Sequence, residues 1–215
     1  SWQADDDAAV AYVDVGGCVV AAGAPVCAAD RGAGVARAFA HAHADRGAVF
    51  FGVSRAFVDG LPLGDDGFDV LPIGLAPVWR PRAWGDVVRT ADKLRNRLKR
   101  AARLGVVVRR AAADEVRAGL GARLSQIAER AAEVRRLPPL GFLVRVELFE
   151  HVEERRFFVA EVHNRVVGFA ACVPIYGRDG WLLEDMMVDD DAPAGTGEAL
   201  VDGVRAGCAD ADVVS

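Results

Sequence analysis

One order of elements occurs twice along the chain and constrains the fold more than any other feature. Each copy runs from a strand through a turn ending in Ala-Pro and a Gly-x-Gly to an alanine-rich helix, then to a second strand. The two turns are Gly23-Ala-Pro25 and Asp191-Ala-Pro193, and the two glycine pairs are Gly32-x-Gly34 and Gly195-x-Gly197. Gly34 and Gly197 are 163 residues apart. The repeat predicts an α+β fold of two related units, each built on a mixed sheet flanked by helices.

The length agrees with this organisation. A chain of 215 residues corresponds to one domain or two small ones at about 150 residues per domain. We expect a first unit at residues 1–110 that includes a basic helix at 90–104, and a second unit at 111–215. On this prediction the second unit is incomplete, because Ser215 falls just inside its last strand.

Apolar spacing predicts two long helices. Residues 90–104 place Leu94, Leu98 and Ala101 on one face, and residues 114–136 show a similar period that Gly119 and Gly121 weaken. Further strands are expected at residues 68–73 and 142–148 and in the segments 156–162, 166–175 and 180–188.

Several classes of protein and site are excluded. No apolar run approaches the ~20 residues that span a bilayer, and the chain has no Ser/His/Asp order, P-loop or dinucleotide-binding fingerprint. The cysteines lie far apart, without a C-x-x-C pair, which argues against a disulfide framework or a metal site. They are Cys18, Cys27, Cys172 and Cys208. We therefore expect a cytoplasmic protein without a metal.

The formal net charge of −5 hides a separation of charge. Between Arg89 and Arg110 nine basic residues stand against one acidic residue, a local charge of +8. Between Glu184 and Glu198 six acidic residues stand against no basic residue, a local charge of −6. The mild average therefore does not exclude a polyanionic partner.

The basic helix carries charged side chains on both sides of its apolar stripe. They are Lys93, Arg97, Lys99, Arg100 and Arg103. Such a row suits the phosphates of a nucleic acid or of anionic lipid headgroups, and its scarcity of acidic partners favours this interpretation. The alternative is a solvated surface helix whose arginine stems cover the core.

The acidic segment leads to a second candidate site. Glu184 and Asp185 end a strand, and Asp191 precedes the glycine turn that opens a helix. Gly195, Thr196 and Gly197 at a helix start are typical of an anion site, but the preceding aspartates suit an ammonium better than a phosphate. Alternatively, Asp191 caps the turn and the other acidic residues are solvated.

Tyr176 and Arg178 form a third candidate. They lie between two expected strands, where a hydroxyl or guanidinium group can orient a carbonyl. The alternative is a plain hairpin turn with Trp181 covering the sheet edge.

These segments together resemble one family: the soluble C-terminal domain of phosphatidylglycerol lysyltransferases. The resemblance extends through nearly the whole chain and depends on the order and spacing of loose motifs. They are Ser1-Trp-Gln3, Val20-Ala-Ala-Gly-Ala-Pro25, Ile73-Gly with Pro77-Val-Trp79, 94–105, Leu140-Gly-Phe142, Phe158-Val-Ala160, Pro174-Ile-Tyr-Gly-Arg-Asp-Gly-Trp181, Leu183-Glu-Asp-Met186 and Asp191-Ala-Pro193.

The resemblance implies two tandem GNAT-like units with mostly antiparallel sheets. It also implies transfer of an aminoacyl group from aminoacyl-tRNA, as co-substrate, to phosphatidylglycerol or another hydroxyl or amine acceptor, without a metal or redox cofactor. The basic helix would then hold tRNA phosphates or lipid headgroups at the inner face of the membrane. Glu184, Asp185 and Asp191 would bind the aminoacyl ammonium, and Tyr176 and Arg178 would line the transfer site.

The chain departs from the family pattern at two places. Met187 and Val188 stand where the resemblance implies an arginine, and Ala194 stands where it implies an asparagine. Two other classes of function stay open. One is a GNAT-type N-acyltransferase that uses coenzyme A, and the other is a non-catalytic polyanion-binding module.

Overall fold

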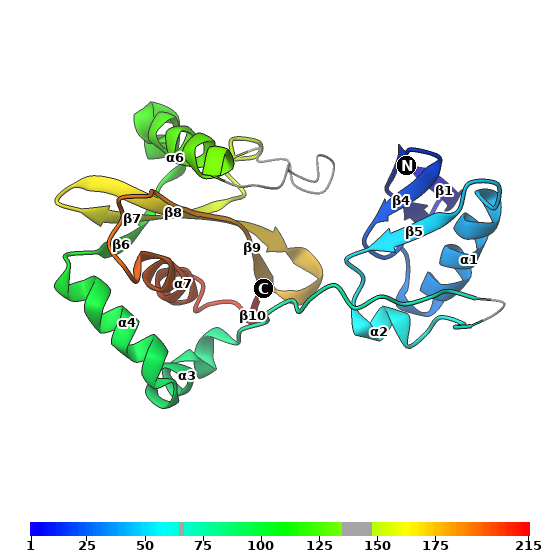
Figure 1. Cartoon of the computed structure of the whole chain (residues 1–215), viewed down its shortest axis with the longest axis horizontal. Coiled ribbons are helices and arrows are strands. Elements are labelled where there is room, and N and C mark those ends of the chain that lie inside the picture. Colours follow the sequence, from blue (N-terminus) through cyan, green and yellow to red (C-terminus); the bar gives the residue numbers. More distant parts are fainter. Residues whose placement is uncertain (65–66, 135–147) are drawn as a thin grey trace. The chain divides into compact units, whose positions relative to one another are not determined.

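The computed structural model describes residues 1–64, 67–134 and 148–215, and the chain divides into two compact units, Ser1–Leu75 and Ala76–Ser215 (Figure 1). The division falls at Leu75, not at the expected residue 110. The reason lies in packing: the basic helix α4 (Asp92–Arg103) contacts α7 (Thr196–Gly207), and β6 (Val107–Ala111) pairs with a strand of the second unit. The basic helix therefore belongs to the second unit.

The first unit, Ser1–Leu75, packs two small sheets around Phe39. Its elements are β1 (Trp2–Asp5), β2 (Ala8–Val10), β3 (Tyr12–Val15), β4 (Cys18–Ala22), η1 (Ala29–Arg31), α1 (Gly32–Ala42), β5 (Ala48–Phe51) and α2 (Arg55–Val58). The ring of Phe39 lies 5.6 Å from Trp2, 5.3 Å from Tyr12 and 5.5 Å from Phe50, each edge to face. These aromatic contacts join the helix to both sheets.

The second unit contains a five-stranded sheet in the order β10-β9-β8-β7-β6. Its strands are β6 (Val107–Ala111), β7 (Arg156–Val162), β8 (Arg165–Ile175), β9 (Gly180–Val188) and β10 (Val213–Val214). All neighbours pair antiparallel except β9 and β10, which are parallel. The sheet is therefore mixed and mostly antiparallel, as expected.

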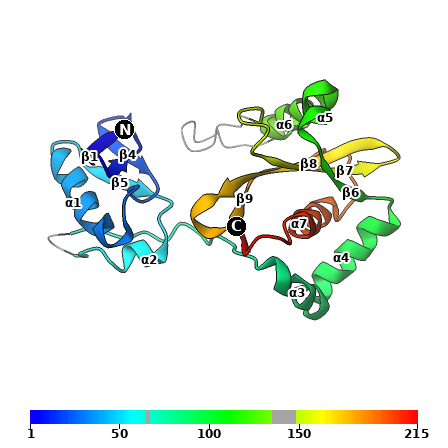
Figure 2. The same ribbon diagram turned by 180° about the vertical axis from the view of Figure 1, so that it is seen from behind.

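Helices cover both faces of this sheet (Figures 1 and 2). Its helical segments are η2 (Pro81–Ala83), α3 (Trp84–Thr90), α4, α5 (Ala113–Glu115), η3 (Val116–Leu120), α6 (Gly121–Val134), η4 (Tyr176–Arg178) and α7. Phe158 and Ala160 of β7 pack with α4 and α7, whereas Phe157 and Val159 pack with α6. Because neighbouring residues of a strand point to opposite faces, the continuous apolar run in β7 lies between two helical layers.

The two units share one topology. In the first, β4 pairs antiparallel with β3, and the chain passes through α1 to β5, which is parallel to β4. In the second, β9 pairs antiparallel with β8, and the chain passes through α7 to β10, which is parallel to β9. The repeated order in the sequence therefore corresponds to a repeated order in the fold, and the α+β prediction is confirmed.

Both expected helices are interrupted. Ala91, with ψ of 87°, separates α3 from α4, and Gly119, with φ of 146°, breaks the helical backbone inside the π-helical turn η3 that precedes α6. The expected strand at 68–73 is absent apart from an isolated bridge at Phe68, because Pro72 cannot donate to a ladder. Residues 142–147 of another expected strand lie outside the described residues.

Candidate active site

Two of the predicted site residues, Tyr176 and Glu184, contact the turn that precedes β7. The Tyr176 hydroxyl donates a hydrogen bond of 2.5 Å to a carboxylate oxygen of Glu154, and Glu184 forms an ion pair with Arg155. Arg155 is held in turn by a hydrogen bond of 2.8 Å to the Glu150 carbonyl. Tyr176 and Glu184 therefore contact neighbouring residues of the same turn, although they lie on different elements.

Strand β9 is irregular at Glu184, the residue that pairs with Arg155. Ala171 of β8 pairs with Asp185, and Cys172 pairs with Leu183, so Glu184 is the extra residue of a β-bulge. A bulge redirects side chains and is common beside active sites. Asp185 is 7% exposed, whereas Glu184 is exposed and faces Arg155.

Arg178 stands apart from this cluster. It ends the short helix η4, it is exposed, and it forms no ion pair with any residue that the structure describes. The next residue, Asp179, has a φ of 45° and turns the chain into β9. Arg178 is therefore free to meet a ligand but is not fixed by a neighbour in the described ranges.

The Tyr176 hydrogen bond gives a titration that can be measured. The Glu154 carboxylate accepts the phenolic proton and repels the phenolate, so it raises the pKa of Tyr176 above its ordinary value of 10. In a Tyr12→Phe background Tyr176 is the single tyrosine of the chain. We expect ultraviolet titration to place its midpoint above 10 and Glu154→Gln to lower it. An unchanged midpoint would contradict the hydrogen bond.

The glycine turn before α7 is used for packing. Gly195 has a φ of 97°, and a Cβ added there would lie 2.7 Å from the Arg97 carbonyl oxygen of α4. The Thr196 hydroxyl is buried and donates a 2.7 Å hydrogen bond to the Pro193 carbonyl, whereas Gly197 is less crowded. Helix α4 therefore packs against the glycine turn at which the sequence suggested an anion site.

Basic residues from other elements neutralise most of the acidic segment. Asp191 forms a 2.8 Å ion pair with Arg165, and Glu198 forms one with Arg97. The Arg97 hydrogen bond lowers the pKa of Glu198. The local charge of −6 counted along the sequence is therefore not the charge of this surface.

Asp189 is the most enclosed of these acidic residues. Its side chain is 2% exposed and accepts hydrogen bonds from Arg123 and Arg130 of α6. Burial by itself raises the pKa of Asp189, but the two guanidinium groups outweigh burial and hold the pKa below its ordinary value. Arg123 also donates to the Val166 carbonyl at 2.9 and 3.0 Å. No sequence motif predicted a role for Asp189, yet its ion pairs join the end of β9 to α6.

The basic helix presents its charges to solvent. Ala101 is buried against α7, whereas four of the five predicted basic residues have no acidic partner among the residues that the structure describes. They are Lys93, Lys99, Arg100 and Arg103. The fifth, Arg97, joins α4 to α7 through Glu198. The helix thus keeps a cationic face while its apolar side packs on the unit.

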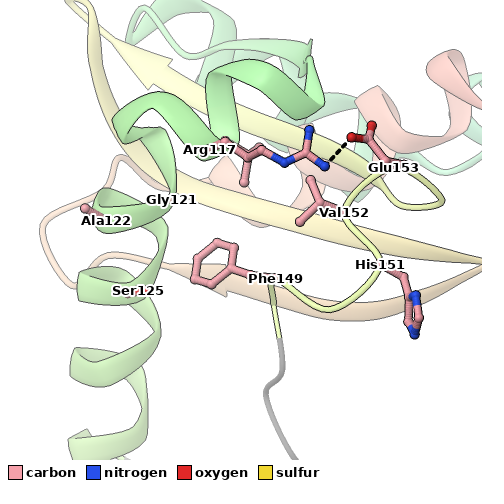
Figure 3. A pocket seen from close by; sticks show the side chains of 9 residues that line it. Arg117, Gly121, Ala122, Ser125, Phe149, His151, Val152 and Glu153 are labelled. Carbon is pink, nitrogen blue, oxygen red and sulfur yellow. Dashed lines mark ion pairs between the residues drawn. The ribbon is translucent and has the colours of Figure 1, made fainter.

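A pocket of about 550 Å³ opens beside α6 (Figure 3). It is lined by Val116, Arg117, Gly121, Ala122, Ser125, Phe149, His151, Val152 and Glu153. Arg117 and Glu153 point toward each other and form an ion pair, and the Phe149 ring lies against Gly121. The pocket therefore combines apolar walls with one pair of opposite charges. No sequence motif predicted this pocket.

Two kinds of feature are absent from the described residues. Within residues 1–64, 67–134 and 148–215, no group of three or more His, Cys, Asp or Glu side chains could hold a metal ion. In the same ranges no helix is both long and apolar enough to cross a membrane.

Comparisons with known proteins identify the family. The family described as "Phosphatidylglycerol lysyltransferase, C-terminal" matches residues 1–205. A domain described as the C-terminal domain of a lysylphosphatidylglycerol synthetase from Agrobacterium fabrum is 16% identical, with a TM-score of 0.77. A structure described as L-PGS from Bacillus licheniformis is 17% identical, with a TM-score of 0.73. Each match covers 100% of this chain and 68% or 66% of the other chain, respectively, so the chain spans about two thirds of their length.

The likeness to these two structures confirms the α+β fold that the resemblance implied. No curated protein sequence matches the chain. The family match is decisive, because it extends over all but the last ten residues. The chain belongs to the phosphatidylglycerol lysyltransferase C-terminal family.

Proposed function

We propose that the chain transfers an aminoacyl group from aminoacyl-tRNA to a hydroxyl or amine of an acceptor such as phosphatidylglycerol. The observation that carries the proposal is the family match over residues 1–205. Two contacts of the turn before β7 support it, because Tyr176 binds Glu154 and the bulge residue Glu184 pairs with Arg155, so ionisable and hydrogen-bonding groups line this turn.

The proposed reaction is an attack on an activated ester. The acceptor oxygen or nitrogen forms a bond to the aminoacyl carbonyl carbon, and the ester bond to the tRNA ribose breaks. The acceptor proton passes to the leaving ribose oxygen, so atoms and charge balance. The reaction needs no change of oxidation state, and the main task of the protein is to position both substrates and stabilise the developing oxyanion.

We assign roles within this scheme. The Arg178 guanidinium orients the carbonyl, and Tyr176, which donates its hydroxyl proton to Glu154, lines the transfer site. Glu184 and Asp185 hold the aminoacyl ammonium, whereas Asp191 pairs with Arg165 beyond the other end of β9 and takes no part. Arg155 holds the Glu184 carboxylate in place through their ion pair.

The basic helix α4 is proposed to bind the polyanionic substrate. Lys93, Lys99 and Arg100 are exposed, and their side chains can approach phosphates without breaking an ion pair in the described part of the chain. Each phosphate contact releases counterions, so binding should weaken steeply as the salt concentration rises. At the membrane the same face suits anionic headgroups.

A transfer assay tests the proposal. The protein is incubated with a pool of aminoacyl-tRNAs and phosphatidylglycerol vesicles, and the lipid extract is examined by mass spectrometry. We expect aminoacylated lipid with the unmodified chain and loss of most product with Lys99→Glu plus Arg100→Glu. Arg37→Glu plus Arg55→Glu makes the same change in charge on exposed residues of the first unit and should leave the product unchanged.

The outcomes of this assay separate the classes of function. Transfer to a soluble amine in place of the lipid would keep the reaction and change the acceptor. Salt-sensitive tRNA binding without any transfer would contradict the proposed enzymatic activity and favour a non-catalytic polyanion-binding module. One observation favours that module. The resemblance implies an arginine at Met187 or Val188, but Met187 is 5% exposed and lies in the apolar core under α6.

The acyl-CoA reaction receives less support. Helix α4 contacts the glycine turn at Gly195, and the Thr196 hydroxyl is engaged by Pro193. Neither group is available to a pyrophosphate in this arrangement. We expect no binding of coenzyme A by calorimetry, and binding at micromolar concentration would support the acyl-CoA reaction.

A further inference from the structure

We propose that Cys172 and Cys208 are a redox-sensitive pair, which a hydroperoxide converts into a reversible disulfide between β8 and α7. The two cysteines are 36 residues apart in the sequence, and both are 0% exposed. They belong to one apolar core cluster, which lies between the sheet and the helices α4 and α7. This pair is separate from the contacts of Tyr176 and Glu184, so the proposal does not depend on the proposed function.

The register of the sheet places Cys172 beneath the end of α7. Cys172 of β8 lies directly opposite Arg156 of β7 in the antiparallel ladder. The Arg156 guanidinium donates a hydrogen bond of 3.0 Å to the Gly207 carbonyl and two of 2.8 Å to the Asp210 carboxylate. Arg156 therefore contacts residues on both sides of Cys208. Because directly opposite residues of two antiparallel strands point to the same face, Cys172 points to the end of α7 that carries Cys208.

The two thiols interact with each other and with the Arg156 guanidinium. The hydrogen bond with Cys172 and the positive charge of Arg156 hold the pKa of Cys208 below its ordinary value, although burial and the Asp210 carboxylate raise it. The same contact between the thiols, together with burial, raises the pKa of Cys172. Cys208 is therefore the sulfur that loses its proton first and attacks an oxidant, whereas Cys172 keeps its proton.

Several contacts fix the Arg156 side chain beside Cys208. The guanidinium carbon lies 4.1 Å from the centroid of the Trp181 ring, and each of its two terminal nitrogens donates to one oxygen of Asp210. The Arg156 side chain is only 14% exposed, so water screens its charge little. A cysteine held next to an arginine is the type of thiol that reacts selectively with oxidants.

An oxidant can reach the pair through the end of α7. Cys208 is the C-terminal cap of α7, and the next two residues, Ala209 and Asp210, are exposed. Helix ends open locally at much lower cost than the centre of a core. Hydrogen peroxide is little larger than water, so opening of this single turn admits it to the Cys208 sulfur.

The oxidation proceeds in two balanced steps. The Cys208 thiolate attacks one oxygen of the peroxide, the O–O bond breaks, and a sulfenic acid forms while the hydroxide takes up a proton. The Cys172 sulfur then attacks the Cys208 sulfur, the S–O bond breaks, and water leaves with the Cys172 proton. The two thiols together lose two protons and two electrons, and the peroxide is reduced to two molecules of water. A thiol reductant reverses the product by disulfide exchange.

The disulfide would fix the end of α7 to the sheet. Such a bond closes a loop from β8 through β9 and α7, and it limits the opening of the last helical turn. We expect hydrogen exchange to be slower at the backbone amides of residues 205–211 after oxidation and to return to its original rate after reduction. Exchange that is equal in the two states would contradict a bond at this position.

Peptide mapping of the whole chain tests the proposal directly. The chain is treated with hydrogen peroxide, free thiols are blocked with iodoacetamide, and the digest is examined by mass spectrometry without reductant. We expect a cross-linked pair of peptides that contains Cys172 and Cys208, is two hydrogen masses lighter than the reduced peptides and disappears with dithiothreitol. Oxidation of either cysteine to a sulfinic acid without a cross-link would overturn the proposal.

Cysteine variants locate the bond. Cys208→Ala should abolish the cross-link and leave Cys172 reduced. Cys18→Ala plus Cys27→Ala, which removes the two half-buried cysteines of the first unit, should leave the cross-link unchanged. A cross-link that is lost with the second variant instead would place the bond elsewhere and overturn the proposal.

A change at Arg156 tests the role of its charge. Arg156→Gln should slow formation of the disulfide about tenfold at pH 7, as a rise of about one unit in the pKa of Cys208 implies. Arg37→Gln, the same change at an exposed arginine of the first unit, should not alter the rate. Raising the pH should restore the rate of Arg156→Gln, because more Cys208 thiolate then forms. A rate that stays low at every pH would show that Arg156 has only a structural role and contradict this part of the proposal.

Discussion

Replacing Asp189 with alanine should lower the free energy of unfolding by about 3 kcal/mol. The Asp189 side chain is 2% exposed and pairs with both Arg123 and Arg130. Its removal leaves the Arg123 guanidinium, itself only 23% exposed, without its carboxylate. Breaking a buried pair costs 3–5 kcal/mol, and the partial exposure of both arginines places this pair at the lower end. Urea denaturation followed by circular dichroism measures the change.

Asp190 provides the control for this prediction. It is the next residue, it is exposed, and it has no basic partner among the described residues. Asp190→Ala should change the free energy of unfolding by less than about 0.5 kcal/mol. Equal urea midpoints for the two variants would show that the Asp189 ion pairs contribute nothing.

The ion pairs of Asp189 with Arg123 and Arg130 make the stability of the fold depend on pH. The folded pKa of Asp189 lies below the unfolded value of about 3.9, so the pair stabilises the fold fully above about pH 4. The stabilisation is lost as the pH falls through the folded pKa. The difference in stability between the unmodified chain and Asp189→Asn should therefore shrink as the pH falls below 4.

Strand positions in the second unit could be predicted because they depend on local pattern. The expected segments 156–162 and 180–188 coincide with β7 and β9, and the helix expected at Thr196 begins there. Apolar runs bounded by turn residues carry this information within a few residues. The bulge at Glu184 could not be predicted, because its position depends on pairing with β8 rather than on the sequence of β9.

Charge illustrates why the site was harder to predict than the fold. The acidic segment was counted as −6 along the sequence, but its partners come from distant elements. Arg165 lies 26 residues from Asp191, and Arg97 lies 101 residues from Glu198. A charge count along the sequence includes only residues close in the chain, whereas the charge of a surface depends on which distant elements the fold brings together. The basic helix kept its predicted charge because few acidic side chains reach it.

The turn at residues 149–155 was missed for a related reason. Its sequence reads as a charged loop, and a charge run usually faces solvent. Only the fold brings Glu154 to Tyr176 and Arg155 to Glu184, and only the fold sets Phe149 against α6. The two unusual φ values at Gly119 and His151 could not be inferred, although the glycine itself did predict a weak point in the helix.

Replacing Gly195 with alanine should lower the free energy of unfolding by about 2–3 kcal/mol. A left-handed conformation costs a residue with a Cβ about 1–2 kcal/mol. The added Cβ would also lie 2.7 Å from the Arg97 carbonyl oxygen and 3.1 Å from the Ala101 Cβ, so α4 must move. A backbone oxygen cannot rotate away as a side chain can, and overpacking of this kind adds about 1 kcal/mol or more. Thermal and urea unfolding measure the loss.

Gly197→Ala is the matched control, because it makes the same change two residues later in the same helix. Its φ is not positive and the nearest atom to an added Cβ, the Met186 Cε, is 4.0 Å away, so it should be neutral or slightly stabilising. The pair also separates two explanations of the glycine turn. If the turn also holds a phosphate through its backbone, both substitutions should impair ligand binding, and Gly195→Ala should still destabilise the fold. If it exists to admit α4, Gly195→Ala alone should destabilise the chain, and it should weaken tRNA binding as α4 shifts.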